Sequence, residues 1–339
     1  MTENPLPAAE EGLRRQFDAC RGAALVYAAV KLGLPETMGA GRWTAEQLAP
    51  ALEASPPHLF RFLRALCVLG ICEEAPDRGF TLAPLGRSLL PGAPARLREK
   101  AVLTVEQYWQ PWARLVHSLK TGQPAFDHVF GTDVWDWRRT NAAQGALFDA
   151  YFAPETAEQA KSIVAAPAFA TARVVADIGG GDGALLAAVL EAHPHVAGIL
   201  LDRPQTIERA RARFQSPTFA GRVRLVAGDF TTGIPVEADL YLLKHVLHDW
   251  NDAECRTILA NCRAAVPGGA RLLVIEQLLP GRAADDPQAV MLDLHMMVVT
   301  GGRERSLDEF QALLAQSGFA VSGVIPAACG VSVIEAAPA

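Results

Sequence analysis

The sequence predicts an α/β protein in which a doubly wound, largely parallel sheet follows a mostly helical N-terminal part. Three observations support this fold class. The apolar run 174–178 is followed by glycines at every second position from 179 to 183, as where a buried strand turns tightly into a helix. A further apolar run, 198–201, leads into Asp202, and a third predicted strand, 223–227, leads into Asp229. Residues 8–34, 58–69 and 101–166 instead show helical periodicity.

Length and composition limit the class of protein. The chain has 339 residues, half of them hydrophobic, which predicts two or three domains with a sizeable core. The net charge of -6 disfavours nonspecific binding to nucleic acid. No apolar run reaches the roughly 18 residues of a membrane span, and the acidic N-terminus is unlike a signal peptide. We therefore expect a cytoplasmic protein without membrane or nucleic-acid partners, whose six scattered cysteines are free thiols.

The N-terminal part reads as a winged helix. Residues 8–34 are predicted to form a long helix with an apolar stripe, which we expect to dock on a second copy of the chain. Thr44 with Gln47 has the pattern of a capping box, and Ser55 is the predicted cap of a second helix. Residues 71–82 alternate around a polar turn like a two-stranded wing.

A winged helix also raises the alternative of a DNA-binding regulator. Residues 42–100 carry only a small excess of basic side chains. The helix at 58–69 offers just Arg61 and Arg64 to phosphates, whereas about six to ten such contacts are usual. We therefore favour a scaffolding role for this domain.

The segment 101–166 is helical and rich in aromatic residues. Each single aromatic side chain is more often core than ligand contact, but together they can line a pocket for a flat ring. The later helix 287–299 adds methionines, which suit either core or a pliable pocket wall. The residues expected in a substrate pocket are Trp109, Trp112, Tyr151, Phe152, Asp293, Met296, Met297 and Thr300.

The strand–glycine–helix segment 174–190 predicts a pocket for a nucleotide-type ligand. The glycines alone also fit an NAD or FAD fingerprint. Asp202 ends the second strand, about twenty residues further on, where a ribose diol would be held. After the third strand, Asp229 offers an acceptor for an exocyclic amine and Phe230 offers a ring to lie against adenine.

The rest of the chain completes a seven-stranded, Rossmann-like sheet. The fourth strand is predicted at 239–246 and the fifth at 270–275, which brings Glu276 to the same edge. A helix at 287–299, a charged loop at 301–306 and a helix from 307 follow. The ranges 320–325 and 330–335 finish the sheet as an antiparallel pair at its edge.

The fourth strand leads into a segment with two histidines. His248 is predicted at the carboxyl end of a central strand, where open α/β sheets bind ligands, and its ordinary pKa suits a general base. His245 is the internal competitor, which we expect to lie still within the strand. No group of side chains has the spacing of a metal site, so we expect no metal.

Four segments carry a family resemblance: Val-Ala-Asp-Ile-Gly-Gly-Gly-Asp-Gly, Gly-Asp-Phe, Lys-His-Val-Leu-His-Asp-Trp-Asn-Asp and Gly-Gly-Arg-Glu-Arg. They resemble the signatures of class I S-adenosylmethionine-dependent O-methyltransferases, the group of plant caffeate and bacterial polyketide and phenazine enzymes. The resemblance covers nearly the whole chain. It implies a homodimer that methylates a hydroxyl of a small aromatic secondary metabolite. It also implies a winged-helix dimerisation domain at 1–100, a helical linker at 101–166 that contributes to the substrate pocket, and a cofactor-binding catalytic domain at 167–339.

The resemblance also implies roles for individual residues. His248 would be the base, with Glu276 and Glu304 flanking it. The chain departs from the plant pattern at Phe230-Thr231, where plant members have Met-Phe, and in the helix before Gly301, which is one residue shorter. The residues expected to contact S-adenosylmethionine are Asp177, Gly179, Gly180, Gly181, Asp202, Arg203, Gly228, Asp229, Phe230, Lys244 and Trp250.

Two other functions remain open at this point. Some relatives of the family hydroxylate, decarboxylate or steer pericyclic reactions instead of methylating. The presence of His248, Glu276 and Glu304 favours methyl transfer over these activities. An NAD-dependent oxidoreductase would leave the Gly-Asp-Phe and His-Asp-Trp segments without a role.

Overall fold

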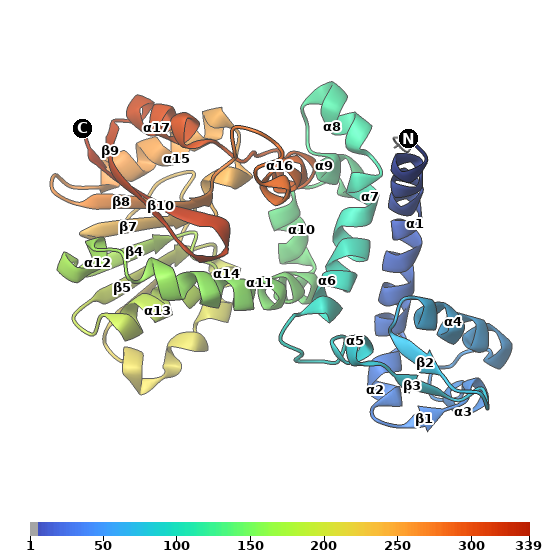
Figure 1. The fold of residues 1–339 in the computed structure, drawn as a ribbon. Coiled ribbons are helices and arrows are strands. Elements are labelled where there is room, and N and C mark those ends of the chain that lie inside the picture. The colour runs from blue at the N-terminus through green and yellow to red at the C-terminus, as the bar shows by residue number, and fades with distance from the viewer. Residues whose placement is uncertain (1–5) are drawn as a thin grey trace, which may run out of the picture. The chain divides into compact units, whose positions relative to one another are not determined.

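The computed structural model describes residues 6–339, with side chains from residue 10 onward, and divides into two compact units that meet between Gln110 and Pro111. Each unit is described by itself below. Figure 1 shows the helices and strands of both. The domain boundaries predicted at residues 100 and 166 stay predictions.

The N-terminal unit is a set of helices with a small antiparallel sheet of strand order β1-β3-β2. The β2–β3 hairpin confirms the predicted wing, while β1 is a strand that the sequence analysis did not predict. The predicted helix 8–34 ends earlier, because Gly33 adopts a left-handed conformation with φ of 68° and a new helix begins at Leu34. The elements are α1 (Leu6–Lys31), α2 (Leu34–Met38), β1 (Arg42–Trp43), α3 (Ala45–Leu48), α4 (Pro56–Val68), β2 (Cys72–Glu74), β3 (Phe80–Leu82), α5 (Pro84–Arg87), α6 (Leu97–Leu103) and the π-helical turn η1 (Thr104–Tyr108).

The two predicted helix caps have different outcomes. Thr44 and Gln47 form the expected capping box at the start of α3. Ser55 occupies the predicted N-cap position of α4, but its side chain accepts no backbone N–H of that helix. Proline at 57 has no N–H to donate, and the Ser55 hydroxyl instead lies 2.9 Å from the ring Nδ1 of His58.

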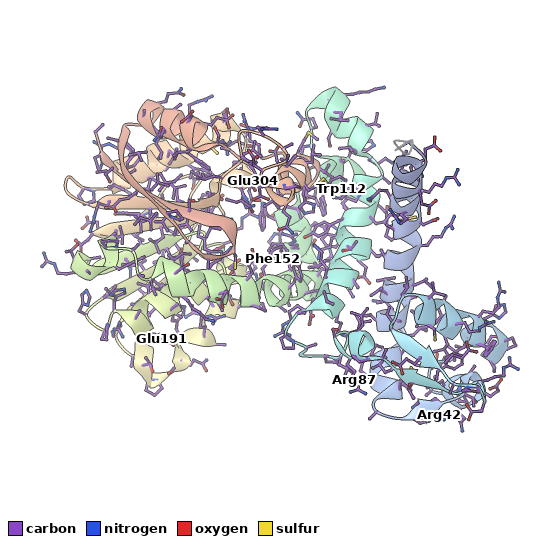
Figure 2. The ribbon with its side chains drawn as sticks, in the orientation of Figure 1. Arg42, Arg87, Trp112, Phe152, Glu191 and Glu304 are labelled. Carbon is purple, nitrogen blue, oxygen red and sulfur yellow. The ribbon has the colours of Figure 1, made fainter. Side chains whose placement is uncertain are left out.

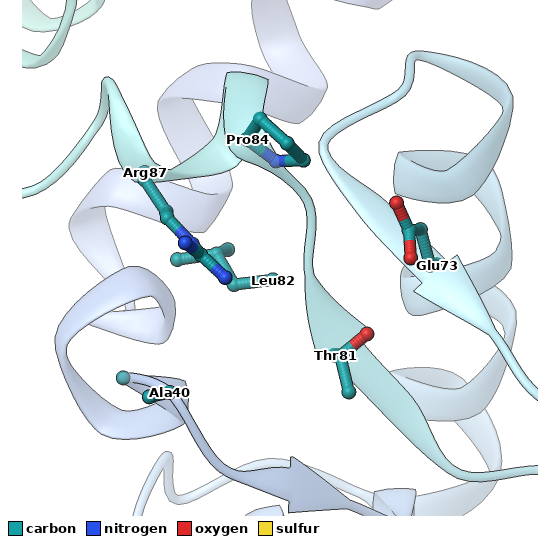
Figure 3. Close-up of a pocket in the computed structure, with 7 residues that line it drawn as sticks. Ala40, Glu73, Thr81, Leu82, Pro84 and Arg87 are labelled. Atoms are coloured by element: carbon teal, nitrogen blue, oxygen red, sulfur yellow. The ribbon is translucent and has the colours of Figure 1, made fainter.

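A shallow hollow of about 360 Å³ lies within the N-terminal unit (Figure 3). One acidic and one basic side chain, Glu73 and Arg87, contribute to its wall. No residue of this hollow was predicted to be functional. Its lining consists of Gly39, Ala40, Glu73, Thr81, Leu82, Pro84 and Arg87.

The C-terminal unit contains a seven-stranded sheet of order β6-β5-β4-β7-β8-β10-β9, which confirms the predicted fold class. Strands β4 to β8 run parallel to one another. Strands β9 and β10 form the predicted antiparallel pair at the edge. The strand order reverses between β4 and β7, which is the point where sheets of this kind bind ligands. The strands are β4 (Val174–Ile178), β5 (Ala197–Asp202), β6 (Val223–Ala227), β7 (Leu240–Lys244), β8 (Arg271–Gln277), β9 (Phe319–Pro326) and β10 (Val331–Pro338).

Helices cover both faces of this sheet (Figure 1). Alternate side chains of β4 enter two separate cores: Ala176 and Ile178 pack with α15 and α17, and Val175 packs with α11 to α14. Because both faces are covered, ligand-binding side chains are confined to the strand ends. These helices are α11 (Ala142–Ile163), α12 (Ala168–Thr171), α13 (Ala184–Ala192), α14 (Pro204–Ala210), α15 (Asp252–Ala265) and α17 (Leu307–Gln316).

Shorter helices precede and extend this core. Helix α16 packs against α8 and α9. All six cysteines are free thiols, as predicted, and no described helix is both long and apolar enough to span a membrane. The remaining elements are α7 (Trp109–Trp112), α8 (Leu115–Thr121), α9 (Ala125–Phe130), α10 (Val134–Thr140), α16 (Pro287–Val299) and the 3-10 turns η2 (Arg213–Gln215), η3 (Pro217–Phe219), η4 (Leu247–Asp249) and η5 (Ala328–Gly330).

Candidate active site

The glycine turn after β4 forms a backbone cradle. Gly179, Gly181 and Gly183 have φ values of 69°, 62° and 77°, in the left-handed region that favours glycine. A Cβ added at Gly180 would lie 2.4 Å from the Asp177 carboxyl group, so that position has no room for a side chain. A Cβ at Gly181 would meet no described atom within 4 Å. The backbone at Gly181 therefore borders open space beside the sheet edge.

Asp177 is a buried carboxylate beneath this cradle. Neither of its oxygens has a hydrogen-bond partner among the described residues. Burial raises the pKa of Asp177 to about 7, although the nearby Lys244 ammonium acts in the opposite direction. Burial also lowers the pKa of Lys244, whose Nζ lies 3.5 Å from Thr156 Oγ1. A buried oxygen without a donor costs free energy, so Asp177 is suited to a ligand that brings a donor.

Asp202 is held in place by the backbone around it. Its Oδ2 accepts a hydrogen bond of 2.9 Å from the Gly181 N–H, and its Oδ1 accepts one of 2.7 Å from the Arg203 N–H. Each carboxylate oxygen keeps a further lone pair, so both can accept hydroxyl groups of a ribose. The Gly228 N–H donates to the Asp202 carbonyl and thereby ties the end of β6 to that of β5.

The expected adenine contacts lie close to this turn. The Phe230 ring meets the Trp250 ring edge to face, with centroids 6.1 Å apart. A Cβ at Gly179 would come within 3.2 Å of Phe230, so this ring adjoins the glycine cradle. Asp229 Oδ1 accepts from the backbone N–H and the hydroxyl of Thr231. The cradle, Asp177 and the Asp202 oxygens fit a nucleoside-type ligand.

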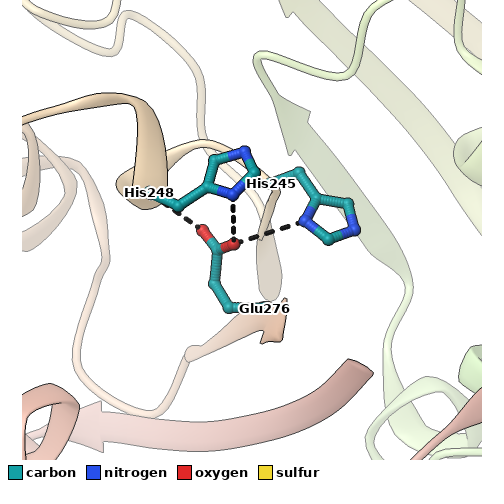
Figure 4. Close-up of side chains that lie close together, drawn as sticks. All are labelled: His245, His248 and Glu276. Atoms are coloured by element: carbon teal, nitrogen blue, oxygen red, sulfur yellow. Dashed lines mark hydrogen bonds and ion pairs between the residues drawn. The ribbon is translucent and has the colours of Figure 1, made fainter. Parts of the chain in front are cut away.

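His248 lies in η4, just after β7, and its ring orientation is fixed by a carboxylate. Its Nδ1 lies 2.8 Å from Glu304 Oε1, and this nitrogen donates to the carboxylate. Its Nε2 is then the nitrogen left to accept a proton. Glu276 Oε1 accepts the backbone N–H groups of Val246, Leu247 and His248 and so fixes the turn itself (Figure 4).

Several carboxylates surround the His248 ring. Burial alone would lower the pKa of His248, but the charges of Glu276, Asp249 and Glu304 outweigh burial and raise that pKa to about 10. Asp249 Oδ1 lies 3.8 Å from His248 Nε2, and burial raises the pKa of Asp249 to about 7. Asp249 was not among the predicted site residues. The arrangement stabilises a charged imidazolium and makes His248 a stronger base than a free histidine.

His245 does not lie within the strand, so that expectation is wrong. Strand β7 ends at Lys244, and His245 has a left-handed φ of 50° that turns the chain out of the sheet. Its Nδ1 lies 3.4 Å from Glu276 Oε2, and its Nε2 lies 3.5 Å from Gln159 Nε2. Burial lowers the pKa of His245 to about 4, which keeps this ring neutral at pH 7.

Arg305 holds the His248 turn against the 301–306 loop, a role that the sequence analysis missed. Its side chain is 1 % exposed and donates to the carbonyl groups of Leu247 and Trp250 and to Asp252 Oδ1. A Cβ at Gly302 would lie 2.0 Å from the His248 carbonyl oxygen, so only glycine allows this approach. The charged Gly-Gly-Arg-Glu-Arg loop was the available signal, but its carbonyl partners follow no sequence pattern.

The residues predicted for a substrate pocket have mixed positions. Asp293 Oδ1 accepts the Glu304 N–H at 2.9 Å and thereby supports the 301–306 loop. Thr300 hydrogen-bonds within the end of α16, where Met296 is buried and Met297 partly exposed. Trp112 stacks on His295 of α16 and donates to its Nδ1 at 3.1 Å.

Aromatic rings of α11 form a separate group. The Tyr151 and Phe152 rings lie 4.7 Å apart, and Phe148 lies equally close to Phe152. Figure 2 labels Phe152 on α11 and Glu304 and Trp112 near α16. Trp109 belongs to the N-terminal unit, so its role in the pocket stays a prediction.

Comparison with known proteins identifies the family. Residues 112–320 match the model of an O-methyltransferase domain, and residues 15–92 match that of an O-methyltransferase dimerisation domain. The chain belongs to the O-methyltransferase family. It is 36% identical over 314 residues to phenazine O-methyltransferase PhzM from Lysobacter antibioticus. The aligned residues cover 92% of each chain.

Solved structures agree with this identification. The mitomycin 7-O-methyltransferase MmcR superposes with a TM-score of 0.91 at 36% identity, over 98% of both chains. The O-methyltransferase NcsB1 of neocarzinostatin biosynthesis, solved with S-adenosylmethionine and 2-hydroxy-5-methyl naphthoic acid, has a TM-score of 0.85 at 32% identity over 94% and 96% of the chains. The predicted family and the predicted cofactor, S-adenosylmethionine, are confirmed.

One relative shows that this fold also serves other chemistry. The aclacinomycin 10-hydroxylase RdmB from Streptomyces purpurascens is 34% identical over 299 residues, which are 87% of this O-methyltransferase and 80% of RdmB. The reaction must therefore be argued from the site residues of this chain.

Proposed function

We propose that this O-methyltransferase methylates a hydroxyl group of a small aromatic secondary metabolite, with His248 as the general base. The observation that carries the proposal is the 2.8 Å hydrogen bond between His248 Nδ1 and the buried Glu304. It fixes one tautomer of the neutral ring and leaves Nε2 as the proton acceptor. A structural histidine would need no such arrangement at the carboxyl edge of the sheet.

The proposed cofactor site uses the cradle after β4 and the ends of β5, β6 and β7. Asp202 would hold the ribose hydroxyls, Asp229 and Phe230 the adenine, and the glycine turn with Asp177 and Lys244 the amino-acid end. Arg203 and Trp250 flank this set. When bound, S-adenosylmethionine supplies a methyl group on a positively charged sulfur, which is already a good leaving group. The chain must therefore position the acceptor and remove its proton.

Proton removal falls to His248. The acceptor hydroxyl would donate to Nε2 at a distance of about 2.6 to 3.2 Å and pass its proton to that nitrogen. Glu304 holds the opposite side of the ring, and Glu276 fixes the backbone of the turn. The same carboxylates that raise the pKa of His248 stabilise the imidazolium that forms.

The proposed acceptor pocket takes a flat ring. Its walls would come from the aromatic side chains of α11, from Trp112 and from the α16 methionines, which combine rigid and pliable apolar surface. A bicyclic or larger phenolic compound matches these walls better than an aliphatic alcohol.

The test is a methylation assay with isotope-labelled S-adenosylmethionine and a panel of aromatic hydroxy compounds. We expect mass spectrometry to find the label on an oxygen of the product. A hydroxylated or decarboxylated product without the label would favour the alternative activity of some relatives. A thermal shift with NAD but none with S-adenosylhomocysteine would favour an oxidoreductase.

We also propose that the protein works as a homodimer. The chain carries a matched dimerisation domain, and α1 leaves the side chains of Leu13 and Phe17 exposed at 58% and 69%. A second copy covering these side chains would remove them from water. The expected cytoplasmic location and the expected absence of membrane and nucleic-acid partners stay predictions.

Light scattering at micromolar concentration should report the mass of a dimer. The double variant Leu13→Glu with Phe17→Glu should shift the mass toward a monomer, while Glu11→Gln on the same helix should not. A wild-type mass of one chain would refute the homodimer.

A further inference from the structure

Folding brings three potential metal ligands together, although their spacing in the sequence predicted no metal site. His245, His248 and Glu276 each offer one ligand atom, and these atoms lie within 4.8 Å of one another. Glu276 Oε2 lies 3.4 Å from His245 Nδ1 and 3.7 Å from His248 Nδ1 (Figure 4). The two rings thus approach the same carboxylate oxygen.

The separations approach those of a tetrahedral coordination shell. An ion held by imidazole and carboxylate atoms at about 2.0 to 2.1 Å places neighbouring ligand atoms about 3.3 to 3.4 Å apart. The two distances to Glu276 Oε2 lie at or slightly above this value, and all three ligand atoms lie within 4.8 Å of one another. Side-chain movements that shorten any separation above about 3.4 Å would bring all three atoms to bonding distance of one ion.

Two of the three ligand atoms lack other partners. Glu276 is fully buried, and while its Oε1 accepts backbone N–H groups, its Oε2 has no hydrogen bond among the described residues. The same holds for His245 Nδ1. The two atoms lie 3.4 Å from each other, which is longer than a good hydrogen bond, so both keep capacity for a further ligand. The His245 side chain is 24% exposed, so the cluster lies close to solvent although these two ligand atoms are buried.

The donor set selects the kind of ion. Two imidazole nitrogens and one carboxylate oxygen form the ligand set of many zinc sites that keep one open position. Calcium and magnesium prefer oxygen ligands alone, and thiolate-seeking ions find no cysteine here. A divalent transition ion such as Zn²⁺ or Co²⁺ therefore fits best.

We propose that His245, His248 and Glu276 form a binding site for one Zn²⁺-class ion, and that this ion inhibits methyl transfer. The inhibitory part rests on the proposed function of His248. An ion on Nδ1 replaces the hydrogen bond to Glu304 and releases the Nδ1 proton to solvent. The neutral ring then keeps its remaining proton on Nε2, so that nitrogen has no lone pair to accept the proton of the acceptor.

Binding is tested directly with Co²⁺, whose visible spectrum is much stronger in a tetrahedral site than in water. We expect the cofactor-free wild-type protein to develop this spectrum and to saturate at one equivalent. His245→Asn removes one ligand and should weaken Co²⁺ binding by about tenfold or more. His245→Cys, which offers a thiolate at the same position, should restore it. The exposed His58 provides the matched control, and His58→Asn should bind as wild type does.

Inhibition is tested by dividing each rate by the metal-free rate of the same variant. Wild-type methyl transfer should fall as the cobalt spectrum grows and return on addition of EDTA, whereas methyl transfer by His245→Asn should resist the same Co²⁺ concentration.

An octahedral spectrum in wild type, or equal Co²⁺ binding by His245→Asn, would overturn the site. Full methyl transfer in cobalt-saturated protein would overturn the inhibition. A normal cobalt spectrum on titration, combined with no methyl transfer by the same protein when it is free of metal, would refute the proposed function and leave the metal site intact.

Discussion

The two sides of the sheet edge are built on different principles. On the β4–β6 side, neither Asp177 oxygen has a hydrogen-bond partner among the described residues. The Asp202 oxygens accept the backbone N–H groups of Gly181 and Arg203, so hydrogen-bonding capacity is left for a ligand. On the β7–β8 side, His248 is bonded to Glu304, and Glu276 is bonded to the backbone of the His248 turn. We infer that the β4–β6 side is completed by its ligand. On the β7–β8 side, protein contacts already fix the His248 ring and turn, although Glu276 Oε2 and His245 Nδ1 have no hydrogen bond among the described residues.

This comparison predicts that the two sides respond differently to substitution. His248→Gln should show the largest effect, a fall in turnover of about 10² to 10⁴, because a positioned base is lost. Affinity for S-adenosylhomocysteine, measured by calorimetry, should stay at the wild-type value, since the ring faces the acceptor. His245→Gln is the matched control and should cost far less turnover. The opposite ranking of the two variants would assign the base to His245.

Asp202→Ala should affect the other side. The loss of a charged acceptor for the ribose hydroxyls should weaken cofactor binding by about 1.5 to 3 kcal/mol per hydrogen bond, roughly ten- to hundredfold. Calorimetry with S-adenosylhomocysteine measures this change, and Asp285→Ala at an exposed position is the control. Unchanged affinity would show that Asp202 does not bind the ribose.

Glu304→Gln should have a smaller effect on turnover than His248→Gln, because the ring keeps its own basic nitrogen. It also removes one of the negative charges that raise the pKa of His248. His248 should therefore lose its proton at a lower pH than in wild type. The rising limb of the plot of methyl-transfer rate against pH should shift to lower pH. A limb that stays in place would show that Glu304 does not tune the base.

Much of the fold follows from local sequence patterns. The strands β4 and β6 and the helix α16 coincide with their predicted bounds, because mostly apolar segments and flanking turn residues mark their ends. The expected gathering of strand ends at one edge also follows from a parallel sheet. The break at Gly33 and the short strand β1 depend on backbone conformation and distant pairing, which periodicity does not reveal.

Site residues could be predicted where the residue type itself provides the chemistry. They could not be predicted where their role depends on contacts with distant parts of the chain. His248 and Asp202 could be predicted as site residues because each lies at or just after the end of a predicted strand. The clamp by Arg305 uses carbonyl groups some 55 residues away in the chain, and any residue can supply a carbonyl. The left-handed His245 likewise brings its ring to Glu276 through a backbone turn that its residue type does not predict.

The most direct test of the central claim is the pH dependence of kcat/KM for wild type and His248→Gln with the same acceptor. Because nearby carboxylates raise the pKa of His248 to about 10, the ring is mostly protonated at neutral pH and the neutral base appears only as the pH rises. We predict a wild-type rate that climbs through the alkaline range and a variant that lacks this limb. A limb caused by ionisation of the acceptor would remain in both proteins. An identical profile in the two proteins would contradict the assignment of His248 as the general base.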